Sequence, residues 1–285
     1  MSTINRFAVM GHPISHSRSP LIHTTFAKQF GIHLVYEKIE VPINGFAEAV
    51  EQFFSRGGHG LNITVPFKEE AWQLAQGHLS ERALLAGAVN TLWQKAGKLH
   101  GCNTDGVGLV SDLKRLDVSL KQARVLVLGA GGAARGIVGP LFDAGCQAIH
   151  IVNRTASRAH TLVADLSKNF AGVMSTHPHQ SLTAGSLDEA QFGAPWSLVI
   201  NATASGLSHQ APQLPSGLYA TGALAYDMMY GAEPTAFMQQ AAHDGATRQA
   251  DGLGMLVGQA AESFYIWHGV KPNTQPVIDL IRASF

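Results

Sequence analysis

A glycine-rich run near the middle of the chain constrains the possible fold more than any other feature. The run Gly129–Gly136 follows an apolar, strand-like stretch, Arg124–Leu128. It contains the spacing G-x-G-x-x-A, with small residues at Gly129, Gly131 and Ala134, which is typical of dinucleotide-binding βαβ units. Gly129 permits a tight turn, Gly131 lets backbone N–H groups approach a pyrophosphate, and Ala134 lets a helix pack on the strand. A purely structural turn is the alternative.

The next segment favours the nucleotide site and indicates which dinucleotide it takes. A second strand-like run, Ala148–Val152, comes at βαβ spacing and ends in Asn153-Arg154-Thr155, with Arg158 one helical turn later. An NAD site places Asp or Glu here to bind the ribose 2′-hydroxyl, whereas a guanidinium grips a 2′-phosphate. Cations in a first helical turn are otherwise disfavoured by the helix dipole. The pattern therefore predicts NADP(H) and hydride transfer, over the alternative of a solvated helix start.

Composition limits the partners of the chain. Its 285 residues are enough for one large or two ordinary domains, and 46% hydrophobic against 14% charged residues fits a compact globular protein. The 20 basic and 20 acidic residues balance, which argues against nucleic acid or an anionic membrane as a partner. An anionic small molecule would have to be held by local groups.

The sequence also argues against disulfides, targeting segments and metal sites. Cys102 and Cys146 give no disulfide framework, no signal-peptide core is present, and no apolar run is long enough to span a membrane. We therefore expect a cytoplasmic protein. The 14 histidines form no H-E-x-x-H motif, and His177-Pro178-His179 lies in a Ser/Thr/Pro-rich loop without a nearby Cys or acid. We expect no metal, and we expect the other histidines to be surface or half-buried residues.

Strand-like and helix-like segments alternate along the chain, which predicts an α/β fold. The expected strands are 6–10, 35–41, 60–65, 88–93, 98–102, 124–128, 148–152, 198–200, 224–226 and 247–250. The expected helices are 19–30, 43–54, 104–116, 235–242, 252–267 and 276–283, with a further helix beginning at Phe67. The segments 88–93 and 98–102 predict a hairpin. Segment 171–195 is the least regular part and is expected to cap an edge of a sheet.

These elements predict two α/β domains. A Rossmann-like NADP-binding domain would occupy 105–251, and a discontinuous substrate-binding and catalytic domain would be built from 1–104 with 252–285. Alternating βα units predict a mostly parallel sheet in each domain. Ligands bind at the carboxyl ends of such strands, so polar residues at strand ends are the candidates for the site.

Several polar residues follow the strands of the first hundred residues. Ser15 and Ser17 stand at alternate positions after the first strand and can present both hydroxyls to one small anion, although turn and cap chemistry is the alternative. Asn62 and Thr64 share one face of a strand, and Lys68 follows it; a solvated strand face with a surface lysine is the alternative.

Two further polar clusters lie at Asn90-Thr91 and at Asn103-Thr104-Asp105. The second cluster precedes a predicted helix, so N-capping by Thr104 or Asp105 is the alternative to a role in a site.

Many ordered segments of the chain, taken together, resemble the shikimate dehydrogenases over essentially its whole length. The matching segments are 15–20 (SHSRSP), 62–68 (NITVPFK), 87–91 (GAVNT), 101–106 (GCNTDG), 129–134, 153–155 (NRT), 201–203 (NAT), 226–230 (YDMMY) and 251–256 (DGLGML). One departure is Ala204, where a serine is common; it removes one hydroxyl near the cofactor.

The resemblance implies the reversible reduction of 3-dehydroshikimate by NADPH, a step towards chorismate and the aromatic amino acids, in a monomer or a homodimer. It assigns catalysis to Lys68 and Asp105. It assigns substrate contacts to Ser15, Ser17, Asn62, Thr64, Asn90, Asp105, Tyr230 and Gln259. It assigns cofactor contacts to Gly129, Ala130, Gly131, Gly132, Ala133, Ala134, Asn153, Arg154, Thr155, Arg158, Thr203, Met228, Gly252 and Met255.

The chemistry of the two catalytic candidates agrees with that reaction. Reducing a ketone creates alkoxide character, which a nearby ammonium can stabilise and protonate, and an adjacent carboxylate would orient the lysine. Whether Lys68, Asp105 or the pair transfers the proton stays open at this stage.

Two alternative functions are weighed against the residues. A quinate/shikimate dehydrogenase that prefers NAD would carry an acidic residue after the second strand of the nucleotide unit, and segment 153–158 has none. A non-catalytic, ligand-sensing relative would lack Lys68 or Asp105, or would carry a DNA-binding segment, and the sequence shows neither change.

Overall fold

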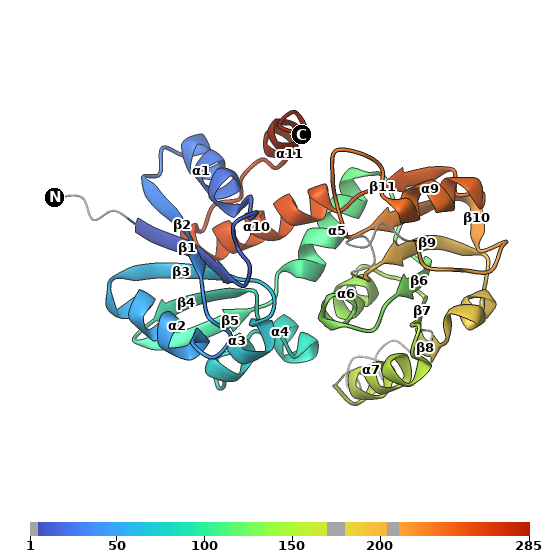
Figure 1. Cartoon of the computed structure of the whole chain (residues 1–285), viewed down its shortest axis with the longest axis horizontal. Helices are drawn as coiled ribbons and strands as arrows, with labels where there is room; N and C mark the ends of the chain where they lie inside the picture. The colour runs from blue at the N-terminus through green and yellow to red at the C-terminus, as the bar shows by residue number, and fades with distance from the viewer. Residues whose placement is uncertain (1–4, 170–179, 204–210) are drawn as a thin grey trace. The chain divides into compact units, whose positions relative to one another are not determined.

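The structure, a computed structural model, describes residues 5–169, 180–203 and 211–285. The chain divides into two compact units, drawn in Figure 1. The first comprises Met1–Gly108 with Leu256–Ser284, and the second Leu109–Met255 with the terminal Phe285. The chain leaves the first unit within helix α5 (Asp105–Arg115) and returns within α10 (Leu253–His268), so the breaks fall inside two helices rather than before them.

The sheet of the first unit is mixed, with the strand order β2-β1-β3-β4-β5. Its strands are β1 (Asn5–Gly11), β2 (Leu34–Glu40), β3 (Gly58–Ile63), β4 (Thr91–Lys95) and β5 (Lys98–Cys102). β1 pairs in parallel with β2 and β3, and the expected hairpin adds β4 and β5 in antiparallel. The helices are α1 (Ser19–Gln29), α2 (Phe46–Ser55), α3 (Lys68–Leu74), α4 (Glu81–Ala86), α11 (Gln275–Arg282) and part of α10.

Alternate residues of β1 serve two different cores, as expected for a strand covered on both faces. Ala8 and Met10 belong to a core cluster that includes residues of α2 and α3, among them Phe46, whose ring stacks on Phe67 at 4.8 Å between centroids. Phe7 and its neighbours on the other face pack with the tryptophan of α10. Figure 1 shows α2 and α3 on one side of this sheet and α1 and α10 on the other.

Helix α1 begins at Ser19, the first residue of the expected range, but has no side-chain cap. Arg18 occupies the N-cap position without a side-chain cap bond, and Ser19 is already helical. The hydroxyl of Ser17 accepts a hydrogen bond from the Ser19 N–H at 3.2 Å. The Ser-Pro pair therefore lies inside the first turn, where proline fits because its missing N–H would have no partner there.

The sheet of the second unit is parallel throughout, with the order β11-β10-β9-β6-β7-β8. Its strands are β6 (Arg124–Leu128), β7 (Ala148–Val152), β8 (Ser181–Gly185), β9 (Trp196–Asn201), β10 (Tyr219–Asp227) and β11 (Arg248–Ala250). Its other elements are α6 (Gly132–Asp143), α7 (Ala156–Asn169), the 3₁₀-helix η1 (Leu187–Gln191) and α9 (Ala236–His243). This is the predicted Rossmann-like arrangement.

Segment 171–195 is more regular than expected wherever the structure describes it. Residues 181–185 form β8, the edge strand beside β7, and η1 follows with a Ser186/Glu189 capping box. The short pattern Ser-Leu-Thr-Ala-Gly is half exposed, which hides a strand from a search for apolar runs. The candidates His177, His179 and Ala204 lie outside the described residues. Within the described part of the chain, no helix is long and apolar enough to cross a membrane.

The fully buried carboxylate of Asp112, on α5, lies against the start of α10 within the second unit. The side chain of Asp112 bonds to Arg115 at 2.8 Å and to the Tyr226 hydroxyl at 2.7 Å. Gly254 lies so close that a Cβ built on it would stand 1.9 Å from the Asp112 carboxylate. Only glycine fits there without a shift of this anchored group.

We therefore expect Gly254→Ala to lower the free energy of unfolding by roughly 1–3 kcal/mol or more, because the added methyl displaces an anchored carboxylate. Urea denaturation would measure the change. Gly45→Ala is a suitable control, because a Cβ on Gly45 meets its neighbours at an ordinary 3.6 Å. Equal stabilities of the two variants would contradict the steric argument.

Candidate active site

The chain turns that follow β3 and β5 bring Lys68 and Asp105 together. Lys68 is the first residue of α3 and Asp105 the first residue of α5. The Lys68 Nζ lies 2.6 Å from Asp105 Oδ2, with the two side chains 28% and 12% exposed. The pair is an ammonium–carboxylate contact that is largely shielded yet still reaches the surface. Lys68 is therefore a half-buried lysine paired with a carboxylate, unlike the solvated lysine of the alternative.

Asn90 supports this pair from below. Two backbone hydrogen bonds hold Asn90 beside β3 and β5. The Ile63 N–H donates to the backbone carbonyl of Asn90, and the Asn90 N–H donates to the carbonyl of Cys102. Its amide Nδ2 donates to Asp105 Oδ1 at 2.8 Å and to Gln259 Oε1 at 3.4 Å. The structure thus brings together four of the predicted site residues: Lys68, Asp105, Asn90 and Gln259.

Thr104 does not use its hydroxyl as a helix cap in the way the alternative supposed. Its hydroxyl lies 2.9 Å from the Asn90 Nδ2 and its backbone N–H donates to Asn90 Oδ1 at 2.9 Å. The N–H of Asp105 is satisfied instead by Asn103 Oδ1 at 3.1 Å. Both residues therefore face the Asn90 amide.

Asn62 is buried in the same polar cluster, so the solvated-face alternative is wrong for it. The Tyr36 hydroxyl donates to Asn62 Oδ1 at 2.7 Å, and Asn62 Nδ2 donates to Ser263 at 3.0 Å and to the Asn90 carbonyl at 3.2 Å. Sequence reasoning missed Tyr36 and Ser263. Each is a single polar group in an otherwise apolar strand or helix, which is a weak signal without the fold.

Ser15 and Ser17 lie in the loop after β1, at the same edge of the sheet. Two backbone hydrogen bonds place Thr64 beside this loop. The Thr64 N–H donates to the Met10 carbonyl, and the carbonyl of the next residue, Val65, accepts from the His12 N–H. Sequence reasoning also missed Lys38, whose ammonium donates to the Ser15 carbonyl at 2.5 Å. An exposed cation beside two serines favours an anion at this loop.

The second unit holds the predicted cofactor residues in and around one pocket of about 860 Å³. The pocket is lined by Gly129, Ala130, Gly131, Gly132, Ala133, Asn153, Arg154, Thr155, Arg158, Leu187, Ala202, Thr203, Ala211, Pro212 and Gln213. Ten of these were predicted; Leu187 and Gln213 are among those that sequence reasoning missed. Ala134 is fully buried behind the pocket, where it packs the helix on the sheet.

The glycines of this pocket fit a dinucleotide. Gly129 has φ of +104°, a conformation that glycine adopts without strain. A Cβ built on Gly131 or Gly132 would meet no atom of the described residues within 4 Å, so neither glycine is covered by that part of the chain at the start of α6. A pyrophosphate can approach the backbone closely only where the residues are small and no neighbouring side chain fills the space, and the two glycines meet this requirement among the described residues.

Arg154 and Arg158 are exposed beside that pocket. Within the described residues neither forms an ion pair, and no Asp or Glu lines the pocket. Thr203 is held in the pocket by Asn201, whose Oδ1 accepts its hydroxyl at 2.7 Å, and Asn201 in turn donates to Asp227. Burial raises the pKa of Asp227, against the hydrogen bonds from Thr235, Met229 and Asn201.

The remaining predicted residues, Met228, Tyr230, Gly252 and Met255, also belong to the second unit but do not line this pocket. Gly252 packs against the chain after β10, because a Cβ on it would stand 2.2 Å from the Met228 carbonyl oxygen. Tyr230 follows in the same loop and is half-buried.

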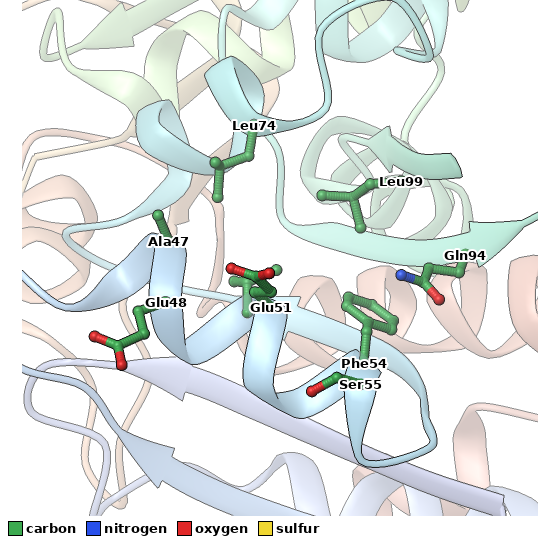
Figure 2. Close-up of a pocket in the computed structure, with 9 residues that line it drawn as sticks. Ala47, Glu48, Glu51, Phe54, Ser55, Leu74, Gln94 and Leu99 are labelled. Carbon is green, nitrogen blue, oxygen red and sulfur yellow. The ribbon is translucent and has the colours of Figure 1, made fainter. Parts of the chain in front are cut away.

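A separate groove of about 520 Å³ lies on the first unit, between α2 and the β4–β5 hairpin (Figure 2). Phe54, Leu74 and Leu99 point into it, while Glu48 and Glu51 stand on α2 at its side. None of the predicted site residues lines it. The groove is therefore not the candidate active site.

The expectation that the histidines are surface or half-buried residues is wrong for His23 and His150, which are 0% and 3% exposed. His23 stacks on Tyr36 at 4.5 Å between ring centroids, and neither ring nitrogen has a hydrogen-bond partner among the described residues. Burial lowers the pKa of His23 to about 3, helped by His268 and opposed by Asn62. His23 therefore stays neutral and acts as a packed ring beneath the polar cluster.

These features define a class of protein: a nicotinamide-dependent oxidoreductase with a parallel dinucleotide-binding sheet and a separate unit carrying an ammonium–carboxylate pair. Family models match in three parts: the shikimate dehydrogenase substrate binding domain at 9–92, shikimate/quinate 5-dehydrogenase at 112–183, and the shikimate 5'-dehydrogenase C-terminal domain at 252–282.

Individual proteins agree with the family models. The chain is 62% identical to the NADP⁺ shikimate dehydrogenase of Bordetella petrii, over 99% of this chain and 97% of that protein. It is similar in structure to an Ael1 enzyme of Pseudomonas putida (42% identity, TM-score 0.86, 97% of each chain). It is also similar to shikimate 5-dehydrogenase of Thermus thermophilus in complex with NADP(H) and shikimate (32%, TM-score 0.84, 99% and 100% of the chains). The chain belongs to the shikimate dehydrogenase family.

The buried His23 makes stability depend on pH. In the unfolded chain His23 takes up a proton below its ordinary pKa of 6.5, whereas in the folded protein it does so only near pH 3. Folding is therefore progressively destabilised as pH falls from 6.5 towards 3. Between pH 7.5 and 5.0 we expect the wild type to lose about 2 kcal/mol relative to His23→Phe, at ~1.4 kcal/mol per pH unit below 6.5. Urea titrations of both proteins would measure it; a constant difference between them would contradict a neutral His23.

Proposed function

We propose that the chain catalyses the reversible NADPH-dependent reduction of 3-dehydroshikimate to shikimate, the step of the shikimate pathway that leads towards chorismate and the aromatic amino acids. The observation that carries the proposal is the 2.6 Å contact between Lys68 and Asp105, with the Asn90 amide bonded to the same carboxylate. The pair supplies a proton donor and an orienting anion at one point. Membership of the family supports the substrate.

The proposed chemistry divides between the cofactor and the chain. When NADPH is bound, its nicotinamide ring supplies the hydride. Lys68 Nζ carries three hydrogens, and one is used by Asp105, so the others are available to the oxygen of the reacting carbon. As that oxygen gains negative charge, the ammonium stabilises it and the Lys68–Asp105 pair delivers the proton. Asp105 keeps the lysine pointed at this oxygen.

We assign the substrate contacts from the same geometry and from the family resemblance. Ser15 and Ser17 would bind the substrate carboxylate, with the neighbouring Lys38 adding a positive charge. The ring hydroxyls would be bound by Asn62, Thr64, Asn90 and Gln259, and Tyr230 would reach the carboxylate end.

The cofactor assignment rests on the pocket of the second unit. Arg154, Thr155 and Arg158 would bind the 2′-phosphate, and Gly129–Ala133 the pyrophosphate. Met228, Gly252 and Met255 would lie near the nicotinamide. In this proposal 1–104 with 252–285 binds substrate and 105–251 binds NADP(H). A cytoplasmic monomer or homodimer without nucleic-acid or membrane partners remains our expectation.

The two alternatives make different demands on these residues. An NAD-preferring quinate/shikimate dehydrogenase would need a carboxylate at the ribose, and there is no Asp or Glu among the described residues that line the pocket. A non-catalytic sensor would have no use for a joined Lys68 and Asp105. The direct test is a spectrophotometric assay of shikimate and quinate, each with NADP⁺ and NAD⁺. We expect turnover to be fastest with shikimate and NADP⁺; absence of turnover with all four pairs would reject the proposal.

Lys68→Ala should reduce turnover by ~10²–10⁴-fold, because a positioned acid–base group is lost. Substrate affinity should change less. Steady-state kinetics with shikimate and NADP⁺ would measure both values, and Lys28→Ala, which removes an exposed lysine on α1, serves as the control. Near-normal turnover with only a raised KM would make Lys68 a binding residue instead.

Arg154→Ala should weaken NADPH binding by roughly ten- to a hundred-fold, because a hydrogen bond to a charged group contributes ~1.5–3 kcal/mol. NADH lacks the 2′-phosphate, so its binding should change little. Fluorescence titration with both cofactors would measure the two affinities, and Lys168→Ala, in the last turn of α7, the helix that begins two residues after Arg154, controls for the loss of charge. Equal losses for NADPH and NADH would show that the arginine serves the fold.

A further inference from the structure

A row of buried hydroxyls lies beneath the Lys68–Asp105 pair and takes no direct part in the proposed reaction. Thr91, Thr104 and Ser263 are each 0% exposed, and they come from β4, from the start of α5 and from α10. The Thr91 Oγ1 lies 2.7 Å from the Ser263 Oγ and 2.9 Å from Asn90 Oδ1. All of these atoms belong to the first unit.

The orientation of the Asn90 amide follows from its partners. The Thr104 backbone N–H can only donate, so the Asn90 atom that faces it must be the oxygen. The Asn90 Nδ2 then faces Asp105 Oδ1. A flipped amide would set its oxygen against a carboxylate oxygen, and it would leave the Thr104 N–H facing another donor. The hydrogen bond from Asn90 to Asp105 therefore forms only while Asn90 keeps this orientation.

The Asn62 amide is fixed by the same reasoning. Its Nδ2 faces the Asn90 carbonyl, which can only accept, so it is the donor to Ser263 Oγ. Ser263 then has its single hydrogen left for an acceptor, and the nearest of its three candidates is Thr91 Oγ1 at 2.7 Å, against 3.1 Å for the Gln259 carbonyl and 3.3 Å for Thr104 Oγ1. With that bond made, Thr91 donates its own hydrogen to Asn90 Oδ1.

We propose that Thr91 and Ser263 are positioning residues, which complete a directed chain of hydrogen bonds from Asn62 through Ser263 and Thr91 to the Asn90 amide and so hold Asp105 against Lys68. The inference rests on the proposed reaction, since it gives the held carboxylate its purpose. Each donor in the chain points towards Asp105, so the polarised bonds strengthen one another. Neither hydroxyl touches the substrate in this proposal.

Thr91→Val and Thr91→Ser test the role of the hydroxyl. Valine keeps the branched shape and removes the hydroxyl, whereas serine keeps the hydroxyl and removes the methyl group. We expect Thr91→Val to lower kcat roughly ten- to a hundred-fold, because a small misplacement of a catalytic group is enough for such losses. The affinity for NADP⁺ should be unchanged. Thr91→Ser should return kcat to within about threefold of the wild type.

The matched control is Thr25→Val, the same change on α1, where the hydroxyl bonds only to the Leu21 carbonyl among the contacts described. It should keep wild-type kcat. Ser263→Ala should lower kcat in the same direction, and in the double variant with Thr91→Val the losses should be less than multiplicative, because both act on one chain. If Thr91→Val does not fold, Ser263→Ala beside Thr91→Ser decides the question in its place.

A readout without activity is the side-chain amide signal of Asn90 in ¹⁵N-labelled, deuterated protein, assigned by its loss in Asn90→Ala. We expect the signal to shift in Thr91→Val and to return in Thr91→Ser. A wild-type kcat and an unmoved signal in Thr91→Val would overturn the inference, and so would equal losses in the valine and serine variants. An unaltered chain that fails to oxidise shikimate would reject the proposed reaction instead, while the amide signal would still test the positioning.

Discussion

The Lys68 ammonium and the Asp105 carboxylate, 2.6 Å apart at a sheet edge, require further hydrogen-bond partners besides each other. Partial burial takes water from both charges, so such a pair is tolerable only when its remaining atoms also find partners. Asn90 meets that requirement for Asp105, and the backbone of Thr104 meets it for Asn90. The polar cluster below the sheet edge follows from this one contact, because each buried group added to satisfy a neighbour needs a partner of its own.

The charged groups that the structure describes in the cofactor pocket of the second unit are more exposed than the Lys68–Asp105 pair, and all of them are positive. Arg154 and Arg158 are exposed near the start of α7, where the helix dipole disfavours cations, and no acid of the pocket neutralises them. Gly131 and Gly132 leave open space beside them. Positive charge that no ion pair among the described residues neutralises, next to glycine backbone that these residues leave uncovered, is an arrangement that an anionic ligand completes. NADP(H) is the cofactor of the family to which the chain belongs.

Sequence reasoning succeeded where local chemistry decides the structure. Strands 124–128 and 148–152 have the observed bounds, because a short, mostly apolar run that ends in glycine or a polar triplet has few other solutions. It could not decide where the fold supplies the environment. For Asn62 it proposed a site residue and left a solvated strand face as the alternative; the burial that excludes this alternative comes from Tyr36 and from α10, far away along the chain. His23 looked like an ordinary helix residue for the same reason.

Ser263 shows why the supporting part of a site is harder to predict than its reacting groups. Lys68 and Asp105 are recognisable in the sequence because charged residues near strand ends are rarely buried without a partner or a function. A single serine in an apolar helix is compatible with any core helix and gives no such signal. The role of Ser263 follows only from the Asn62 amide and the two threonine hydroxyls that it faces. An all-apolar packing of the same volume would cost less desolvation. The polar cluster is less stable than such a packing, but it keeps each amide in one orientation and so holds the carboxylate in a single position. Reduction of a ketone at one carbon requires a proton donor whose position is fixed in this way.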